Sequence, residues 1–292
     1  MTKRLYIFGL GYAGLAIARA AMAKGYAVAG TVRSDDKAAP LKAEGITVEL
    51  FGGDSTALNS ASHILCTIAP DGDDGDPALS HCEATDPPKP AWIGYLSTTG
   101  VYGDAGGGWV DETTPPAPTL PRSVRRLDAE RAWQSLGTHW DAPVHLFRLP
   151  AIYGPSYDGR ARSALDQVRA GTARRIDRPG QVFSRIHVED IAAAVVASMA
   201  RPAPLPGRVY NVADAEPAPQ ADVIAYACEL LGLPVPPLLS WDAAAAELSD
   251  MARSFWAESR RVRAEGFKRE LGVVLKYPTY REGLRAIIAQ AT

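Results

Sequence analysis

The sequence has few cysteines and histidines, and neither residue type is spaced as in a metal site. The three cysteines, Cys66, Cys82 and Cys228, form no CxxC pair, which argues against a disulfide framework and a zinc finger. The five histidines are dispersed without ligand spacing. We therefore predict no metal site, and the odd number of scattered thiols favours a reducing compartment, the cytoplasm.

Long apolar runs and an excess of charge of one sign are also absent. No run reaches the roughly 18 apolar residues that suggest a membrane span. The net charge is −2, so no global basic field points to nucleic acid or to an anionic membrane. Lys3 and Arg4 ahead of an apolar stretch imitate a secretion signal, but the glycines inside that stretch favour a buried strand–helix unit. We therefore expect a small-molecule substrate as the partner.

What the sequence does contain is a short apolar strand that runs directly into a GxGxxG turn. Residues 4–8 form the strand, a segment of helical period follows the turn, and a second apolar run covers 26–32. Such glycines permit a tight turn, a close approach to a pyrophosphate and close helix–strand packing. The pattern predicts a dinucleotide site, and the alternative is a packing turn without a ligand. The predicted cofactor residues here are Gly9, Gly11, Tyr12, Ala13 and Gly14.

The end of the second predicted strand indicates the type of dinucleotide. In NAD-binding units a carboxylate about 20 residues after the glycines accepts hydrogen bonds from the ribose, whereas Arg33 stands there in this chain. The planar fork of an arginine suits a phosphate, so we expect NADP rather than NAD, held by Arg33 and Ser34. The alternative is that Arg33 is a solvated residue at a strand end. Ala69 and Pro70, after the fourth predicted strand, complete the expected cofactor site.

Strand and helix patterns alternate through the first half of the chain, which predicts an α/β fold with a doubly wound parallel sheet. The predicted strands are 4–8, 26–32, 46–50, 62–68, 91–97 and 143–149. After about residue 150, helices are broken by proline and glycine. The predicted helices are 160–170, 190–200, 219–231, 242–251 and 278–290, with Asp190 as the N-cap of the second. The chain of 292 residues is long enough for two closely joined parts with ample core.

Further segments follow the glycine turn in a fixed order. They are 96–104 (LSTTGVYGD), 147–155 (FRLPAIYGP), 186–191 (IHVEDI), 209–214 (VYNVAD) and the tail 270–284. Across essentially the whole chain, they resemble the extended short-chain dehydrogenase/reductase superfamily, in its NAD-dependent epimerase/dehydratase group. The resemblance implies a dinucleotide-binding Rossmann domain over 1–150 and a smaller, mainly helical C-terminal substrate lobe over 151–292.

The resemblance also implies a catalytic set of Ser/Thr, Tyr and Lys, with Tyr and Lys spaced YxxxK on one helix. The Tyr exchanges a proton with the substrate oxygen, the Lys holds the ribose, and the Ser/Thr orients the substrate. Thr98 falls on the Ser/Thr position. If Glu130 is aligned with a Glu common in the family, Arg122 stands at the Tyr position and Arg126 at the Lys position. This helix contains no tyrosine, which makes the active site atypical.

A different group must then serve as the acid, because an arginine does not release its proton near neutral pH. Arg126 fits the ribose and pyrophosphate as a fixed cation. For the proton we consider Tyr153, Tyr157 and His187, and His187 has the most suitable intrinsic pKa. We select Tyr157 and His187 alongside Thr98 and Arg126 as the catalytic candidates.

His187 and several other residues near the expected cleft have a structural alternative. His187 can fix the turn ahead of Asp190, and Tyr102 and Tyr153 can serve loop packing. Arg148 and Arg185 can bind an anionic substrate or pair with carboxylates at the lobe boundary.

These observations predict a cytoplasmic, NADP-binding oxidoreductase or epimerase-like enzyme that acts by hydride transfer on an unknown small molecule. The alternative is a catalytically inactive dinucleotide-binding sensor or regulatory protein. A sugar-nucleotide epimerase or dehydratase proper is disfavoured; a dehydratase of this type usually has acidic residues where Thr99 and Gly100 stand. The helix near 122–136 often forms a dimer contact in the family, so the resemblance also implies a homodimer as one option.

Overall fold

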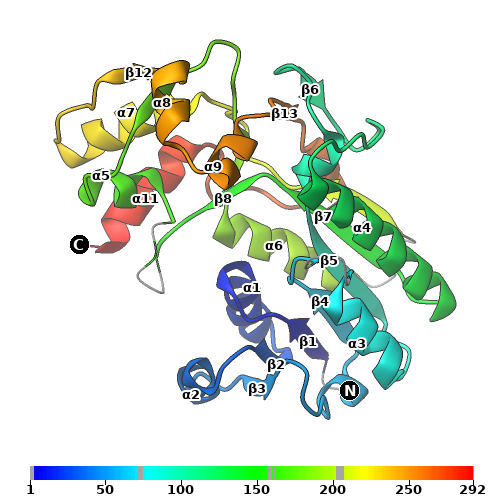
Figure 1. Ribbon diagram of the computed structural model, residues 1–292. Coiled ribbons are helices and arrows are strands. Elements are labelled where there is room, and N and C mark those ends of the chain that lie inside the picture. Colours follow the sequence, from blue (N-terminus) through cyan, green and yellow to red (C-terminus); the bar gives the residue numbers. More distant parts are fainter. Residues whose placement is uncertain (1–2, 71–74, 157–159, 161, 202–206, 292) are drawn as a thin grey trace.

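Seven parallel strands form the central sheet, in the order β11-β7-β5-β4-β1-β2-β3 (Figure 1). The computed structural model describes all residues except 1–2, 71–74, 157–159, 161, 202–206 and 292. The strands are β1 (Arg4–Phe8), β2 (Ala27–Val32), β3 (Thr47–Leu50), β4 (His63–Cys66), β5 (Trp92–Thr98), β7 (Val144–Leu149) and β11 (Arg208–Asn211). The strand order reverses between β1 and β4. In such sheets, ligands bind at the carboxyl ends of the strands, at this point.

Helices cover both faces of the sheet, which gives the Rossmann-type α/β fold. On one face lie α1 (Tyr12–Ala23), α2 (Ala38–Ala43) and α6 (Val188–Met199), and on the other α3 (Pro77–Thr85) and α4 (Pro121–His139). The buried side chains of β1 alternate between the two cores: Leu5 and Ile7 belong to the first, Tyr6 and Phe8 to the second. This alternation is the period of two expected of a strand buried on both faces.

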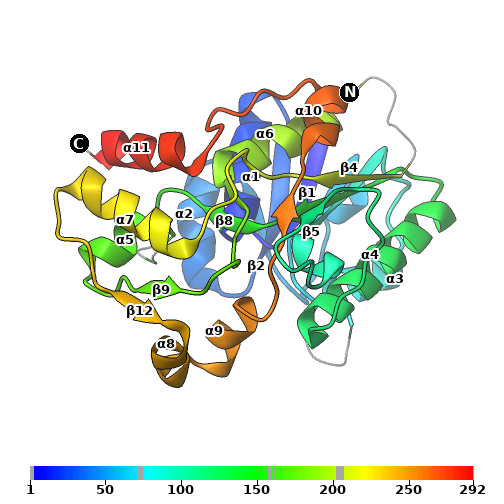
Figure 2. The ribbon, with the colours of Figure 1, turned by 90° about the horizontal axis from the view of Figure 1, so that it is seen from above.

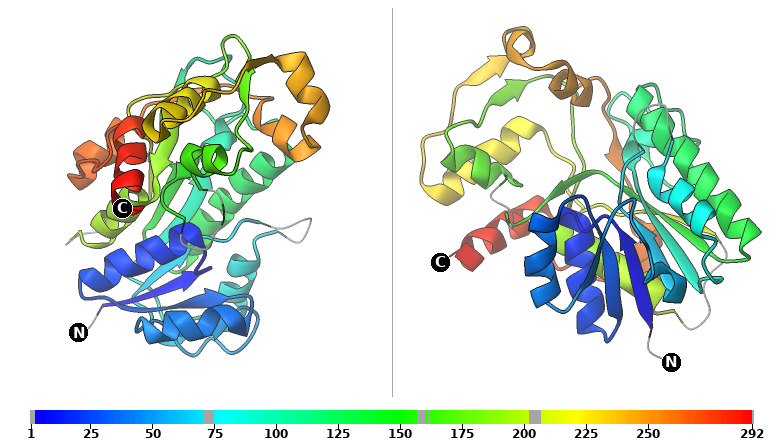
Figure 3. Two further views of the ribbon diagram at one scale, coloured as in Figure 1. Left: turned by 90° about the vertical axis from the view of Figure 1, so that its left-hand side faces the viewer. Right: turned by 60° about the horizontal axis from the view of Figure 1, so that its bottom comes forward.

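Most of the remaining elements form a smaller part at one end of the sheet strands, as Figure 2 and Figure 3 show from further sides. Its strands pair as β8 (Ala151–Tyr153) with β10 (Arg185–His187) and β9 (Arg175–Asp177) with β12 (Leu238–Ser240). Its helices are α5 (Ala164–Arg169), α7 (Gln220–Leu231), α8 (Trp241–Glu247), α9 (Asp250–Phe255) and α11 (Tyr280–Ala291). β6 (Trp109–Val110) pairs with β13 (Arg261–Val262), ahead of α10 (Glu265–Leu271), which instead packs against β11 and α6. In the described part of the chain, no helix combines the length and the apolar character needed to cross a bilayer.

The path of the chain does not follow a simple division at residue 150. After β8 and β10, the chain returns to the sheet, where α6 packs beside α1 and β11 pairs with β7. The sequence did not predict this seventh strand, because it contains only four residues and depends on its pairing with β7. The predicted division into two domains, over residues 1–150 and 151–292, stays a prediction.

Two local expectations were wrong. The helix expected over 242–251 is two helices, because Ser249 caps a new one with its hydroxyl accepting from the Ala252 N–H. Asp190 is not an N-cap: α6 begins earlier, and His187 caps it. The carboxylate of Asp190 instead accepts from the backbone N–H groups of Lys276 at 2.7 Å and Tyr277 at 3.1 Å, which ties the tail to α6.

Candidate functional site

The glycine turn after β1 has the geometry that a pyrophosphate requires. Gly9 has a φ of 92°, in the region that favours glycine. A Cβ on Gly14 would collide with the carbonyl oxygen of Gly9, so α1 packs directly against the turn. A Cβ on Gly11 would meet nothing within 4 Å, and no side chain caps α1 at this residue. The open N-terminus of α1 therefore fits the phosphates of a dinucleotide.

Neighbouring strands hold this turn in place. The Thr67 hydroxyl, just after β4, donates to the Gly9 carbonyl at 2.6 Å. The Gly9 N–H in turn donates to Thr31 Oγ1 of β2 at 2.9 Å. Tyr12 opens α1 together with Ala13, and its hydroxyl donates to the Pro155 carbonyl at 3.0 Å. Tyr12 therefore links the turn to the segment after β8.

Arg33 and Ser34 follow β2 directly, at the same edge of the sheet as the glycine turn. Both residues are exposed. Among the described residues, none forms a hydrogen bond or ion pair with the Arg33 side chain. Its guanidinium is thus available to a phosphate, and its exposure equally fits a solvated strand end.

A cavity of about 350 Å³ lies at the carboxyl edge of the sheet, between β5, α4 and the smaller part of the protein that lies at the end of the sheet strands. It brings together Ala69 and Pro70 from the predicted cofactor site with Thr98 and Arg126 from the predicted catalytic set. Its other lining residues are Thr99, Gly100, Arg122, Ser123, Pro150, Ala151, Val182, Phe183, Ser184, Ser254, Phe255, Glu258, Arg260 and Val262. Four residues predicted from distant parts of the sequence therefore share one cavity.

Two hydroxyl groups meet at one wall of this cavity. Thr98 ends β5, and its Oγ1 accepts from the Gly100 N–H at 3.1 Å. A Cβ on Gly100 would lie 3.3 Å from Thr98 Oγ1 and 2.7 Å from Ser123 Oγ. A larger residue at position 100 would thus cover both oxygens. The Ser123 hydroxyl makes no hydrogen bond with any described residue, so it can bind a ligand.

Arg122 and Arg126 lie one helical turn apart on α4 and both line the cavity. Arg126 donates to the Leu96 carbonyl at 2.7 Å and to the Tyr95 hydroxyl at 3.2 Å. Arg122 donates to the hydroxyl of Ser254 and, at 3.2 Å, to its carbonyl. Its guanidinium also lies 4.5 Å from the centre of the Phe255 ring. These contacts hold both arginines as fixed cations.

His187 lies outside the set of cavity-lining residues. Its ring is fully buried, its Nδ1 accepts from the Glu189 N–H at 3.2 Å, and it packs against Tyr153 and Tyr277. Burial lowers the pKa of His187 to about 4, so the ring is neutral at pH 7. This arrangement favours the structural alternative for His187, a helix cap. The other selected proton donor, Tyr157, lies outside the described residues.

Three further residues considered from the sequence are likewise held away from the cavity. The Tyr153 hydroxyl donates to the Thr279 carbonyl at 3.3 Å, where α11 begins. Tyr102 donates to Asn211 at 2.8 Å. Arg148 pairs with Glu130, with its Nη2 at 2.7 Å from Oε2, in a fully buried contact. Packing and carboxylate pairing therefore account for these side chains.

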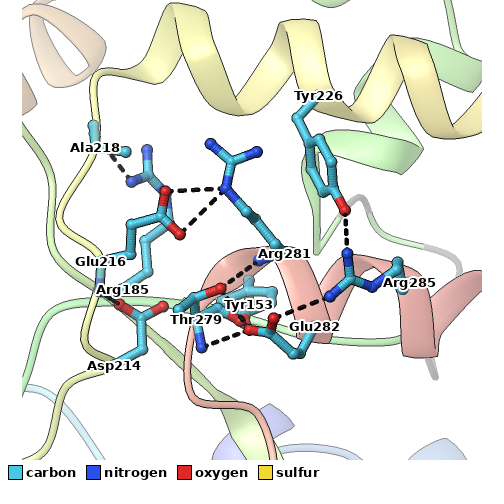
Figure 4. Close-up of polar contacts among 10 residues, drawn as sticks. All are labelled: Tyr153, Arg185, Asp214, Glu216, Ala218, Tyr226, Thr279, Arg281, Glu282 and Arg285. Carbon is cyan, nitrogen blue, oxygen red and sulfur yellow. Dashed lines mark hydrogen bonds and ion pairs between the residues drawn. The ribbon is translucent and has the colours of Figure 1, made fainter.

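Arg185 is also engaged inside the protein, as Figure 4 shows. Its guanidinium donates to the carbonyls of Phe183 at 2.7 Å and Ala218 at 3.0 Å. In the same cluster, Glu216 pairs with Arg281 at 3.0 Å, from the first turn of α11. The cluster joins the loop after β11 to the tail of the chain, and none of the residues labelled in Figure 4 is among the described residues that line the cavity.

The wall contributed by the second part of the protein was not predicted from the sequence. Ser184, Ser254, Glu258 and Arg260 belong to segments without a recognisable motif, and only the fold brings them to β5 and α4. Ser123 had a usable signal, because it lies three residues before Arg126 and therefore on the same helical face.

Known proteins share both the fold and the sequence pattern. The NAD dependent epimerase/dehydratase family model matches residues 79–213. YeeZ of Escherichia coli K12 is 29% identical over 240 residues, which cover 74% of this chain and 80% of YeeZ. A functionally unknown conserved protein from Silicibacter pomeroyi is 48% identical, with a TM-score of 0.89 and 99% of each chain covered.

A more distant structure has the same fold. The UDP-glucuronic acid 4-epimerase from Bacillus cereus, in complex with NAD, has a TM-score of 0.79 at 17% identity, with 98% of this chain and 97% of the epimerase covered. The glycine turn, the order of the later motifs and the seven-stranded sheet all agree with these matches. Residues 79–213 match the NAD dependent epimerase/dehydratase family, and the fold of the whole chain agrees with that match.

Proposed function

We propose that this chain is an oxidoreductase or epimerase-like enzyme that binds NADP and acts on a small molecule in the cavity. The observation that carries the proposal is the common location of the glycine turn and the cavity at one edge of the sheet. Ala69 and Pro70 follow β4, beside the turn, and line the same cavity as Thr98. When bound, the dinucleotide would supply hydride-transfer chemistry.

The residues of the chain would position the reactants. Gly9, Gly11 and Gly14 would admit the pyrophosphate, and Arg126 would hold the nicotinamide ribose. The hydroxyls of Thr98 and Ser123 would bind the reacting substrate oxygen. Because a hydroxyl both donates and accepts, this pair can pass on a proton from water. Such a relay would replace the tyrosine that the helix lacks.

The preference for NADP rests on Arg33. Its exposed guanidinium lies beyond β2, next to the glycine turn, and has no partner among the described residues. The Bacillus cereus epimerase carries NAD, but at 17% identity this neighbour supports the fold alone.

A fluorescence titration with NADPH and NADH tests the proposal. We expect the protein to bind NADPH more tightly, and Arg33→Ala to weaken NADPH by about 1–3 kcal/mol, roughly 5- to 150-fold, with little effect on NADH. Lys24→Ala, which removes an exposed cation at the opposite end of α1, is the matched control. Equal losses for both dinucleotides in Arg33→Ala would contradict the phosphate assignment.

A second candidate function is a dinucleotide-binding sensor without catalysis. It is favoured by the composition of the cavity, since no Tyr, His or Lys is among its described lining residues. The absorbance of NADPH, followed with a panel of carbonyl compounds, separates the two functions. Oxidation that depends on a substrate supports an oxidoreductase. Because an epimerase-like enzyme returns the hydride and leaves the absorbance unchanged, the compounds are also analysed by NMR, and tight binding with neither oxidation nor conversion of any compound supports the sensor.

We also propose a cytoplasmic location and small-molecule partners only, without nucleic acid or membrane. All three cysteines are buried and free, which suits a reducing compartment. A homodimer through α4 is part of the same proposal, and the molecular mass in solution would test it.

A further inference from the structure

The cavity contains two arginines that have only neutral partners within the protein. Arg122 donates to the hydroxyl and carbonyl of Ser254, and Arg126 to a carbonyl and a tyrosine hydroxyl. No ion pair joins either guanidinium to a carboxylate of the described residues. Both are half-buried, so solvent screens their charges only in part.

The other charges near the cavity do not neutralise this pair. Glu258 also lines the cavity, but it is paired with Arg260 and accepts from the Thr119 hydroxyl at 2.9 Å. Asp76 lies within electrostatic range of Arg126. Its oxygens, however, accept from the backbone at the start of α3 and from the Trp133 ring N–H. Two cations of the cavity thus remain without a direct counter-charge.

Like charges four residues apart on a helix repel each other, and Arg260 adds to this repulsion. Burial lowers the pKa of Arg260, and the charge of Arg122 lowers it further, against the opposing effect of Glu258. A bound anion would relieve the repulsion. A carboxylate or a phosphate suits the site because its oxygens match the planar fork of a guanidinium.

Arg122 is prepared for such a ligand. Ser254 occupies two of its five N–H groups, which leaves three without a partner among the described residues. The Phe255 ring lies against the guanidinium, with the ring centre 4.5 Å from the guanidinium carbon.

We propose that the substrate carries a carboxylate or phosphate group, and that Arg122 binds it with the support of the charge of Arg126. This inference rests on the proposed function, because it identifies the class of substrate at the same site. The position that holds the proton-donating tyrosine in the family then serves as an anion receptor in this chain.

Calorimetric titration with inorganic phosphate and with oxalate, at constant ionic strength, tests this inference. The protein is first saturated with NADPH, so that the phosphates of the dinucleotide occupy the glycine turn. We expect at least one probe to bind, and Arg122→Gln to weaken it at least tenfold. Arg131→Gln, an exposed residue of the same helix paired with Asp128, should change the affinity less than twofold. Arg122→Lys keeps the charge but loses the planar fork, so its affinity for the probe should lie between the affinities of wild type and Arg122→Gln.

The outcomes separate this inference from the proposed function. If NADPH binds but neither probe does, or if Arg122→Gln binds the probe as wild type does, the anion receptor is refuted and the proposed function stands. If NADPH does not bind, the same titrations are made on the protein alone. A loss of affinity for the probe that is confined to the Arg122 variants then supports the anion receptor without the proposed function. Circular dichroism melting of each variant shows that a lost affinity is not a lost fold.

Discussion

The hydroxyls of Thr98 and Ser123 share one wall of the cavity because residue 100 has no side chain. A Cβ at Gly100 would stand within 3.3 Å of both oxygens. The two hydroxyls come from different elements, the end of β5 and the first turn of α4. One site for a substrate oxygen is thus formed by residues 25 positions apart.

Thr98→Ala should reduce turnover while leaving the affinity for the dinucleotide nearly intact. The lost hydrogen bond to the substrate is worth about 1–3 kcal/mol, roughly a 5- to 150-fold drop in kcat/KM. Steady-state kinetics and the NADPH titration measure the two quantities separately. Thr138→Ala, on the exposed part of α4, serves as the control. An unchanged kcat/KM in Thr98→Ala would remove Thr98 from the mechanism.

At the scale of single residues, motifs predicted positions that lie together in the structure, while the roles of these residues stay predictions. Thr98 and Arg126 were placed by their spacing, and the structure puts both in one cavity with Ala69 and Pro70. His187 was a candidate because its segment was expected to border the cleft and because its intrinsic pKa is suitable, but burial lowers that pKa to about 4. A pKa depends on the side chains that surround a group, which a motif does not describe.

At the scale of elements, a buried ion pair fixes α4 to the sheet. Arg148 of β7 donates to both oxygens of Glu130 on α4, at 3.0 and 2.7 Å. Ser97 of β5 donates to the same carboxylate at 2.6 Å. This contact orients the helix that carries Arg122 and Arg126.

Glu130→Gln should lower the free energy of unfolding by about 3–5 kcal/mol, because it leaves the buried Arg148 without a counter-charge. Urea denaturation measures the change. Asp128→Asn breaks only the exposed pair with Arg131 on the same helix and should cost less than about 1 kcal/mol. Similar losses in the free energy of unfolding for the two variants would show that the buried pair does not hold α4 on the sheet.

The sequence predicted the elements whose signal is local. All six predicted strands occur within a few residues of their expected bounds, because each is a short apolar run between turns. The strand Arg208–Asn211 and the division between α8 and α9 were missed. The first depends on pairing with a distant strand, and the second on a serine cap inside an otherwise helical pattern.

At the scale of the whole molecule, stability should depend on the protonation of Asp214. This carboxyl is buried; its Oδ1 accepts from the Glu216 N–H at 3.2 Å, and its Oδ2 has no hydrogen-bond partner in the described structure. Burial raises the pKa of Asp214 to about 7, which the charge of Arg185 opposes and those of Glu216 and Asp190 reinforce. The folded protein therefore binds this proton more tightly than the unfolded chain does.

The contribution of Asp214 to stability is thus present at low pH and is lost as the pH rises through about 7. Buried His63 and His187, whose pKa values burial lowers to about 4, act in the opposite direction between about pH 4 and 6.5. A comparison of variants cancels the histidine contributions. Between pH 5 and pH 8, the free energy of unfolding of Asp214→Asn should rise by about 2–4 kcal/mol relative to that of wild type, as measured by urea denaturation. Parallel curves for the two proteins would refute this assignment.

The return of the chain to the sheet after β10 has a consequence for synthesis on the ribosome. When only residues 1–150 have emerged, β7 presents an outer edge of unpaired backbone, because β11 is still to come. The apolar side of α1 that α6 covers is also bare. Such an edge pairs readily with other chains. Nascent chains of this length would therefore be substrates for chaperones, and a gene truncated there would yield aggregates rather than a working half.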